Sequence, residues 1–448
     1  MEVKPIEIKS EARTEADFEK IHRSWAQRAL IEPFRKRFRG EAWNPDALAF
    51  VEKAVDDLAY TLEWERTGAL REEGKQLLAD GCDDPLVVYL TNRIGSRVTA
   101  DTGDSRKALG KLLVDLRKDG RFNRALVCLI AKDYHVVGKL NGKGRQRNGE
   151  EIVSLTREAL EEGSYAEAGD EEVFLHHQVA AQWGGAAEKE PELFVGLSNG
   201  LKFPEWVQLT VKGSVEINLA WKDRGSGWAQ TVTETGWRGF GEHLVQARDH
   251  LTNAWKLKPD RPYAATLMIT VTMGGYGTTG ETERDWFDRA IVAQFDYKSA
   301  YYRILHAYRP RWGGSHEQML AFGKACLATK RYESPVPIFF YNACRNIAEE
   351  LQDWRSFYRR PEVAKPLIAL SRALVEEPSL ATQRERRTHL LAVHLWMCGD
   401  YQAAAKILEG VPGKLHDGAQ FALRGLRETE NSMRSEVATL RSPPRKGE

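Results

Sequence analysis

The stretch from Trp206 to Trp255 reads WVQLTVKGSVEINLAWKDRGSGWAQTVTETGWRGFGEHLVQARDHLTNAW. Its second half carries apolar residues at the spacing of an amphipathic helix, and residues 211–221 are expected to form its partner helix. Between these two helices, residues 222–236 form an insertion in which Gly225 and Gly227 favour sharp turns. We therefore expect a helical hairpin whose helices are separated by a long, tryptophan-rich loop.

Small and apolar residues in the second helix follow a spacing known from one family of helical repeats. Successive positions of the pattern are separated by four, three and five residues, and these separations are found between Ala247, Leu251, Ala254 and Pro259. In this pattern the small residues mark close helix–helix contacts, and a proline follows the second helix. The stretch resembles the tetratricopeptide repeat (TPR), and the resemblance implies a stack of helical hairpins.

A second match to the same repeat lies in LLAVHLWMCGDYQAAAKILEGV, residues 390–411. The expected places are filled by Leu391, Ala392, Leu395, Gly399, Tyr401, Ala404 and Leu408. Residues 399–401 correspond to the turn between paired helices. Residues 286–304 and 310–328 also resemble an uncharacterised bacterial domain family associated with TPR-like repeats, which implies a fold but no known activity.

Elsewhere the sequence predicts helices that alternate with turns of Gly, Asp and Pro, so the expected fold is an all-α, TPR-like α-solenoid. Five regions are expected: an N-terminal helical cap (1–66), irregular helical hairpins (67–187), central repeats (188–345), C-terminal repeats (346–427) and a disordered tail (428–448). Within the second region, the basic, glycine-rich stretch 141–149 (NGKGRQRNG) is expected to be a loop.

Composition restricts the classes of function. The chain has 448 residues, with 65 Lys and Arg against 64 Asp and Glu, and a net charge of +1. This balance argues against binding to nucleic acid or to an anionic membrane. No apolar run reaches the roughly twenty residues of a membrane-spanning helix, and no signal peptide is visible. Five widely spaced cysteines without a CxxC pair favour a reducing compartment, so we expect a cytoplasmic protein.

We expect no catalysis, no metal site and no cofactor. No cysteine lies in a recognisable catalytic signature. His243 and His250 share a helix, but their spacing places them about 10 Å apart along its axis. That separation is too long for two ligands of one ion, because Zn–N bonds are about 2 Å long. We therefore interpret both histidines as solvated or capping groups.

A competing interpretation rests on Gly275, Gly277 and Gly280, which have the GxGxxG spacing of a dinucleotide-binding loop. Residues 266–273 (TLMITVTM) could form the preceding strand, and Asp296 stands where a ribose-binding acid is expected. However, no alternating series of strands and helices surrounds the motif. Residues 266–273 also fit a helix face, in which case the glycines make turns between repeats. A nucleotide-dependent enzyme is therefore the alternative function.

Tryptophan and arginine gather at three places, as is typical of protein-binding hot spots. The residues expected to contact a partner are Trp221, Arg224, Trp228, Trp237, Arg238, Arg311, Trp312, Arg355 and Arg359. The alternative is that these rings fold inward and form the core of a long loop. The rarity of exposed tryptophan clusters favours this alternative. Arginine between aromatics also suits single-stranded nucleic acid, but the neutral net charge favours acidic protein segments. The expected function is the binding of a protein or peptide partner in a solenoid groove, as an interaction or scaffold module.

Overall fold

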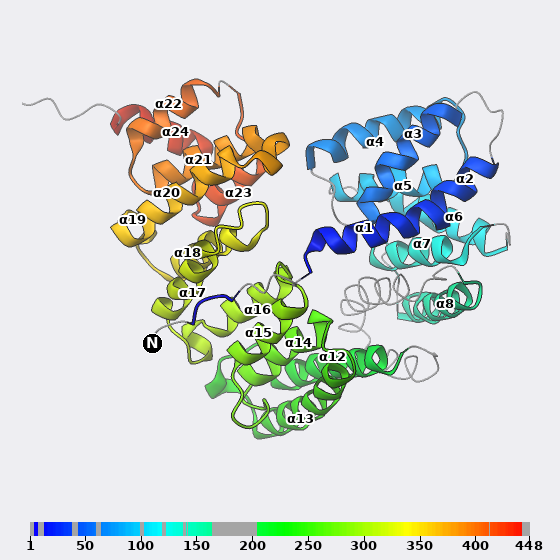
Figure 1. The fold of residues 1–448 in the computed structure, drawn as a ribbon, viewed down its shortest axis with the longest axis horizontal. Helices are drawn as coiled ribbons and strands as arrows, with labels where there is room; N and C mark the ends of the chain where they lie inside the picture. Colours follow the sequence, from blue (N-terminus) through cyan, green and yellow to red (C-terminus); the bar gives the residue numbers. More distant parts are fainter. Residues whose placement is uncertain are drawn as a thin grey trace, which may run out of the picture. The chain divides into compact units, whose positions relative to one another are not determined.

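The computed structural model describes residues 4–7, 13–37, 44–59, 64–98, 103–118, 122–137, 140, 142–163, 204–411 and 413–440. Within these ranges every regular element is a helix, which confirms the all-α class (Figure 1). The expected boundary between residues 187 and 188 lies outside the described residues, as do residues 441–448 of the expected tail.

The chain divides into two compact units. Residues 13–280 form the N-terminal unit, and residues 281–448 form the C-terminal unit together with residues 1–12. The division after residue 280 falls inside the expected central region 188–345, so helices on its two sides belong to different packing units.

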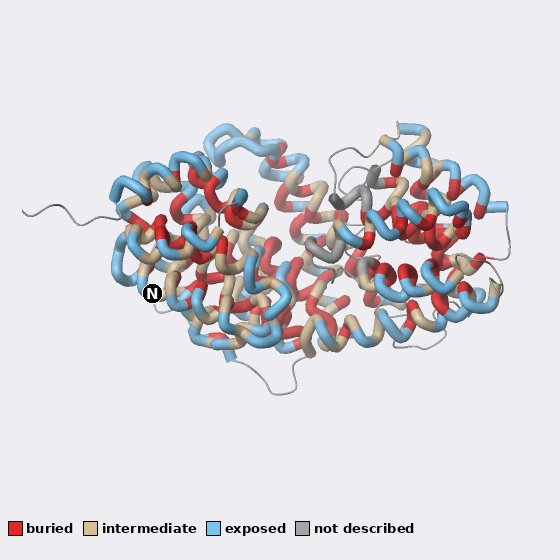
Figure 2. The backbone as a smooth tube through the Cα atoms, turned by 90° about the horizontal axis from the view of Figure 1, so that it is seen from above, coloured by how far each residue is buried: buried red, intermediate tan, exposed pale blue. Residues whose placement is uncertain are grey.

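The described helices of the N-terminal unit are α1 (Glu15–Ala26), the π-helical η1 (Gln27–Ile31), α2 (Glu32–Arg37), α3 (Asn44–Ala54), η2 (Val55–Ala59), α4 (Trp64–Ala79), α5 (Pro85–Val98), α6 (Gly103–Lys118), α7 (Arg124–Val137), α8 (Gly142–Glu161), α12 (Glu205–Arg224), η4 (Ala229–Thr231), α13 (Glu234–Leu257) and α14 (Pro262–Met273). From α3 to α8, and from α12 to α14, the α-helices of this unit that follow one another also pack against one another. Figure 2 shows buried residues along one side of most helices and exposed residues along the other, as amphipathic sequences require.

The core around α7 includes a buried charged group as well as apolar side chains. Residues 125–132 of α7 are all buried. Asp133 accepts hydrogen bonds from Arg93 at 2.5 Å and from Tyr89 at 2.8 Å, both on α5. Because a buried charge is costly unless it is paired, this group fixes how α5 and α7 meet.

The prediction of a loop over residues 141–149 was wrong, because α8 begins at Gly142. Asn148 on α8 is buried, and its Oδ1 lies 3.0 Å from Nδ1 of His135 on α7. Packing against α7 thus stabilises a helix that the glycines of this stretch disfavour.

α12 and α13 form the expected hairpin (Figure 1). Gly213 lies so close to α13 that a Cβ atom there would be 2.5 Å from Cγ of Leu251. Ala247 and Ala254 are buried on the same face of α13 as Leu251. The small residues of the repeat-like pattern therefore lie where the helices approach closely.

The connection between α12 and α13 is shorter than the expected insertion over residues 222–236. α12 continues to Arg224 and α13 begins at Glu234, which leaves residues 225–233 as the loop. Gly225 has φ of 72°, a left-handed conformation that glycine adopts without strain, and it ends α12. Thr233 caps α13 by accepting a hydrogen bond from the amide of Gly236 at 3.0 Å.

The C-terminal unit also consists of consecutive packed helices. They are α15 (Glu283–Ala293), α16 (Lys298–Ala307), η5 (Pro310–Trp312), α17 (His316–Ala328), η6 (Val336–Ile338), α18 (Phe339–Glu350), α19 (Trp354–Arg359), α20 (Pro361–Glu376), η7 (Pro378–Gln383), α21 (Arg384–Met397), α22 (Tyr401–Glu409), α23 (Asp417–Gly425) and α24 (Glu430–Leu440). The segment 4–7 lies on α15, where Arg284 donates hydrogen bonds to the carbonyl groups of Lys4 and Pro5 at 2.5 and 2.7 Å.

The turn predicted at residues 399–401 is confirmed. Gly399 has φ of 83° and ends α21, as glycine commonly does after a helix. Asp400 caps α22 by accepting a hydrogen bond from the amide of Ala403 at 3.1 Å.

The prediction of a disordered tail over residues 428–448 was wrong for its first half. Residues 430–440 form α24, in which Met433 and Val437 are buried. Glu430 on this helix accepts hydrogen bonds from the amide of Leu415 at 3.2 Å. The stretch is polar overall, but Met433 and Val437 are buried, and Glu430 and Glu436 accept hydrogen bonds from residues outside the helix.

Candidate partner-binding surface

The loop between α12 and α13 is held in place by Arg224, one of the expected partner-binding residues. This side chain is buried, and its Nη1 donates to the carbonyl groups of Gly225 at 3.2 Å and Gly227 at 3.1 Å. Its guanidinium also lies over the rings of Trp221 and Trp237, 5.5 and 5.3 Å from their centroids. Arg224 therefore shapes the loop from inside instead of facing a partner.

Phe240 is the buried centre of an aromatic group at this end of the hairpin. Trp221, Trp237 and Tyr276 pack edge-on against it, with ring centroids at 5.1, 5.7 and 6.1 Å. Trp221 is half-buried in this group. For Trp221 and Arg224, the inward arrangement weighed from the sequence is the observed one.

Trp228, Trp237 and Arg238 face outward. Trp228 is 72% exposed in the loop, and Trp237 is 38% exposed at the start of α13. Arg238 is exposed and makes no ion pair with any residue that the structure describes. Isolated exposed tryptophans are uncommon, so two of them beside an available guanidinium mark this end of the hairpin.

A shallow depression of about 560 Å³ adjoins Trp237 and Arg238. It is lined by Trp237, Arg238, Gly241, Glu242, Val245, Gln246 and Tyr276. A Cβ atom on Gly241 would be 2.5 Å from the hydroxyl oxygen of Tyr276, so glycine is what lets this ring approach α13. We call Trp228, Trp237, Arg238 and Tyr276 the tryptophan surface.

Sequence reasoning missed part of the lining of the depression. Glu242 and Gln246 follow Arg238 at steps of four along α13, so helical spacing could have indicated them. Tyr276 lies beyond α14 in the chain, and only tertiary packing brings it to Phe240.

Tyr276 also bears on the glycine motif at 275–280. Residues 262–273 are the helix α14, so the strand required before a dinucleotide-binding loop is not formed. Gly275 has φ of 86°, and the amide of Tyr276 donates to the carbonyl group of Val271 at 3.2 Å. These features end a helix with a left-handed residue, which matches the interpretation of the glycines as turn formers.

The second expected cluster, Arg311 and Trp312, lies in the C-terminal unit. Nε1 of Trp312 donates to Nε2 of His306 at 3.0 Å, and Arg311 lies exposed over the Trp312 ring. Burial, together with the positive charges of Arg311, Arg309 and Arg303, lowers the pKa of His306 to about 4. His306 is therefore a neutral acceptor near pH 7, and Trp312 is engaged within the unit.

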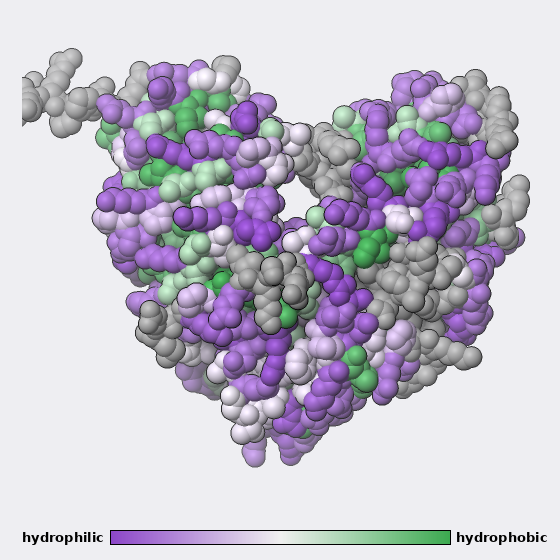
Figure 3. Space-filling model, viewed as in Figure 1, coloured by the Kyte–Doolittle hydropathy of each residue, from purple (hydrophilic) through white to green (hydrophobic). Residues whose placement is uncertain are grey.

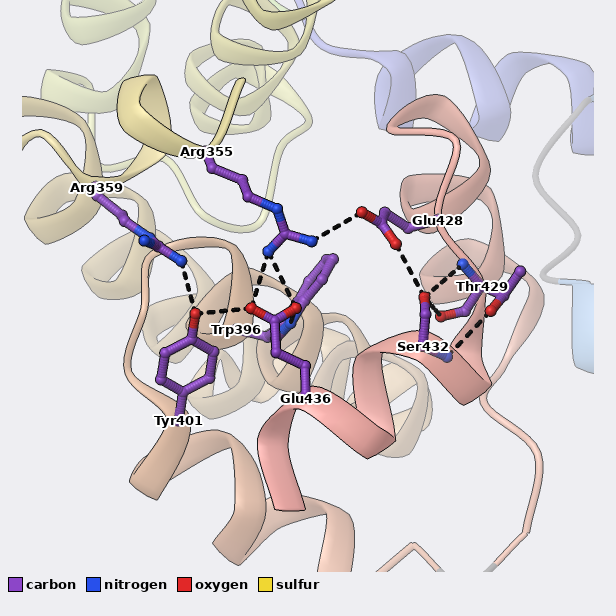
Figure 4. Close-up of polar contacts among 8 residues, drawn as sticks. All are labelled: Arg355, Arg359, Trp396, Tyr401, Glu428, Thr429, Ser432 and Glu436. Carbon is purple, nitrogen blue, oxygen red and sulfur yellow. Dashed lines mark hydrogen bonds and ion pairs between the residues drawn. The ribbon is translucent and has the colours of Figure 1, made fainter. Parts of the chain in front are cut away.

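The third expected cluster is occupied by the chain itself (Figure 4). Arg355 donates to both carboxylate oxygens of Glu436 at 3.0 Å and to Glu428 at 2.8 Å. Arg359 donates to the hydroxyl oxygen of Tyr401 at 2.6 Å. Arg355 thus attaches α24 and the preceding turn to the rest of the unit, and Arg359 holds the hydroxyl group of Tyr401 that donates to Glu436.

The histidines of α13 also differ from the sequence interpretation. Nδ1 of His243 lies 2.6 Å from a carboxylate oxygen of Glu216, so this side chain links α13 to α12. Burial lowers the pKa of His250. Among the described residues, no group of three or more His, Cys, Asp or Glu side chains is arranged to hold a metal ion.

No helix in the described part of the chain has the length and apolar character needed to cross a membrane. On the face drawn in Figure 3, hydrophilic residues predominate and hydrophobic residues form small, separate patches. Comparison with known proteins gives no relative, since no family model, curated protein or solved structure matches this chain.

Proposed function

We propose that this chain is a TPR-like interaction module that binds a peptide segment of a protein partner at the tryptophan surface. The observations that carry the proposal are the exposed ring of Trp228 in the loop and the exposed ring of Trp237, which lines the depression on α13. Large aromatic side chains contribute most of the binding free energy in many interfaces, because they bury much area at little cost in conformational entropy.

The side chains around the depression define the chemistry of the partner. Trp237 and Tyr276 offer ring surface to an apolar side chain, and Arg238 offers a guanidinium to a carboxylate. Gln246 can donate to and accept from a peptide backbone. The proposed ligand is therefore a short segment that carries an apolar residue next to Asp or Glu.

The TPR-like arrangement is part of the proposal. Its support is the packing of consecutive helices in each unit, together with the buried small residues Ala247, Ala254 and Ala404 at the repeat-like positions. A stack of hairpins presents loops and helix faces in series, which suits a binding role without catalysis. We also propose the cytoplasm as its compartment, because all five cysteines are free thiols and four of them are buried.

Affinity capture with matched variants tests the proposal. The wild-type chain, Trp228→Ala/Trp237→Ala and Leu257→Ala are each used as bait, and bound proteins are identified by mass spectrometry. Leu257 is the matched control, because it is an exposed apolar residue on α13 outside the tryptophan surface. We expect a partner that wild type and Leu257→Ala retain and the double variant loses. Equal capture of every protein by all three baits would contradict the proposal.

A further inference from the structure

The contacts of Glu436 form a site built for a carboxylate (Figure 4). Its Oε1 accepts from Arg355 and from the hydroxyl group of Tyr401, and its Oε2 accepts from Arg355 and from Nε1 of Trp396, each at 3.0 Å. All these groups are donors toward Glu436, and together they can saturate both oxygens of one carboxylate. We call Arg355, Trp396 and Tyr401 the carboxylate cradle.

The cradle is positioned by helices other than α24. The guanidinium of Arg355 lies over the rings of Trp354 and Trp396, 4.5 and 5.2 Å from their centroids. Arg359 donates to the hydroxyl oxygen of Tyr401, which leaves the phenolic hydrogen to point at the carboxylate. These supporting contacts come from α19, α21 and α22, so the donors are preorganised for a carboxylate that another segment supplies.

The helix that fills the cradle is held by few apolar contacts. α24 has 11 residues, of which Met433 and Val437 are buried, and Leu440 at its end is 49% exposed. Burial of two side chains stabilises a helix by less than the ordering of its backbone costs, so its attachment also depends on the polar contacts of Glu430, Arg434 and Glu436.

We propose that the surface of α19, α21 and α22 is a docking site for an acidic amphipathic helix of a protein partner, and that α24 covers this site in the free protein. The spacing of Met433, Glu436 and Val437 defines the ligand: a glutamate that follows one apolar residue by three positions and precedes another by one. Charge complementarity selects such a helix, because every cradle group donates to a carboxylate. α24 then acts as an internal competitor that the partner displaces.

A labelled peptide tests this in the full-length chain. The probe is a fluorescein-labelled peptide of residues 428–440, ETENSMRSEVATL, measured by fluorescence anisotropy. Met433→Asp and Glu436→Ala weaken the attachment of α24 and leave the cradle intact, so each should bind the probe at least tenfold more tightly than wild type. Arg355→Lys in the Met433→Asp chain removes the planar fork and should weaken binding about tenfold. The matched control is Arg372→Ala in the same Met433→Asp chain, which removes an exposed arginine of α20. It should change the affinity for the probe less than twofold.

The result that would overturn the proposal is equal affinity of the probe for wild type and for both opened variants, with circular dichroism showing that they are folded. A dimer of the opened variants in size-exclusion chromatography, with α24 exchanged between chains, would identify a second copy as the occupant and would also contradict it.

Hydrogen exchange of the wild-type chain tests the same idea without any substitution. The amides of residues 430–440 should exchange at least tenfold faster than those of residues 391–397 in α21. Equal protection of the two helices would show that α24 opens only with the whole unit, and would contradict the proposal. Binding at the tryptophan surface is independent of both outcomes, because Trp228 and Trp237 belong to the N-terminal unit.

Discussion

Gly213 is the residue on which the contact between α12 and α13 depends most directly. A Cβ atom there would lie 2.5 and 2.7 Å from the Cγ and Cδ2 atoms of Leu251, and Leu251 is fully buried. We expect Gly213→Ala to destabilise the N-terminal unit by about 1–3 kcal/mol through overpacking, less the roughly 1 kcal/mol by which alanine favours a helix. Thermal or urea unfolding measures the difference.

Gly68 provides the control for this substitution. It also lies within a helix, α4, and a Cβ atom there would meet nothing within 4 Å. Gly68→Ala should therefore leave stability unchanged or raise it by up to about 1 kcal/mol. Equal effects of the two substitutions would mean that α12 and α13 do not pack as closely as described.

His394 is a second residue with a measurable consequence. It is buried beside Ser371, whose hydroxyl lies 2.6 Å from Nδ1, and burial lowers its pKa to about 3. In the unfolded state His394 has its ordinary pKa of 6.5, so it takes up a proton at a higher pH there than in the folded state. Proton uptake therefore lowers the stability of the folded state as the pH falls from 6.5 toward 3.

Nuclear magnetic resonance can follow the ring of His394 directly. Its carbon-bound proton should show no titration step between pH 7.5 and 5 in the folded chain, with His394→Gln used to assign the signal. The same proton should titrate near the ordinary value in urea. A midpoint near 6.5 in the folded protein would refute the buried, neutral state.

At the scale of elements, the attachment of α24 should depend on acid. Burial raises the pKa of Glu436, but hydrogen bonds from Tyr401, Trp396 and Arg355 outweigh it and hold the pKa below the ordinary 4.5. A carboxylate whose pKa is lower in the folded state than in the unfolded state stabilises the folded state when the pH is above the unfolded-state pKa. This stabilisation is lost as the pH falls through the folded-state pKa. α24 should therefore loosen below about pH 4.5.

Comparison with Glu436→Gln isolates this effect. At pH 7 the variant should be less stable than wild type by about 1–3 kcal/mol, because a charged acceptor of several hydrogen bonds is lost. The difference in Tm between the two proteins should shrink as the pH is lowered below 4.5. A difference that stays constant from pH 7 to pH 3 would exclude a role for the Glu436 charge.

Two helices, α8 and α24, show where sequence reasoning fails. The stretch 141–149 was expected to be a loop because of its glycines, and residues 428–448 were expected to be disordered because they are polar. Both errors have one cause, because local propensity does not include contacts with residues outside the segment. Asn148 pairs with His135, and Glu436 pairs with Arg355. A helix with strong apolar periodicity, such as α13, was predictable because its own residues encode the buried face.

At the scale of the whole molecule, the sequence predicted the all-α class, but not the division into two units after residue 280. The candidate site was predictable in part. Trp228, Trp237 and Arg238 were identified because tryptophan and arginine gather in this stretch of the sequence. The inward positions of Trp221 and Arg224 depend on their contacts with Phe240 and the loop carbonyl groups. Which arginines are available to a partner is a property of the folded chain.

Binding through the tryptophan surface is the central claim, and calorimetric titration of a purified, captured partner into the purified chain tests it most directly. Removal of two hot-spot rings should cost at least about 2 kcal/mol, so Trp228→Ala/Trp237→Ala should raise the Kd by about 30-fold or more. Leu257→Ala should leave the Kd within twofold of wild type. Identical Kd values for wild type and the double variant would contradict the claim.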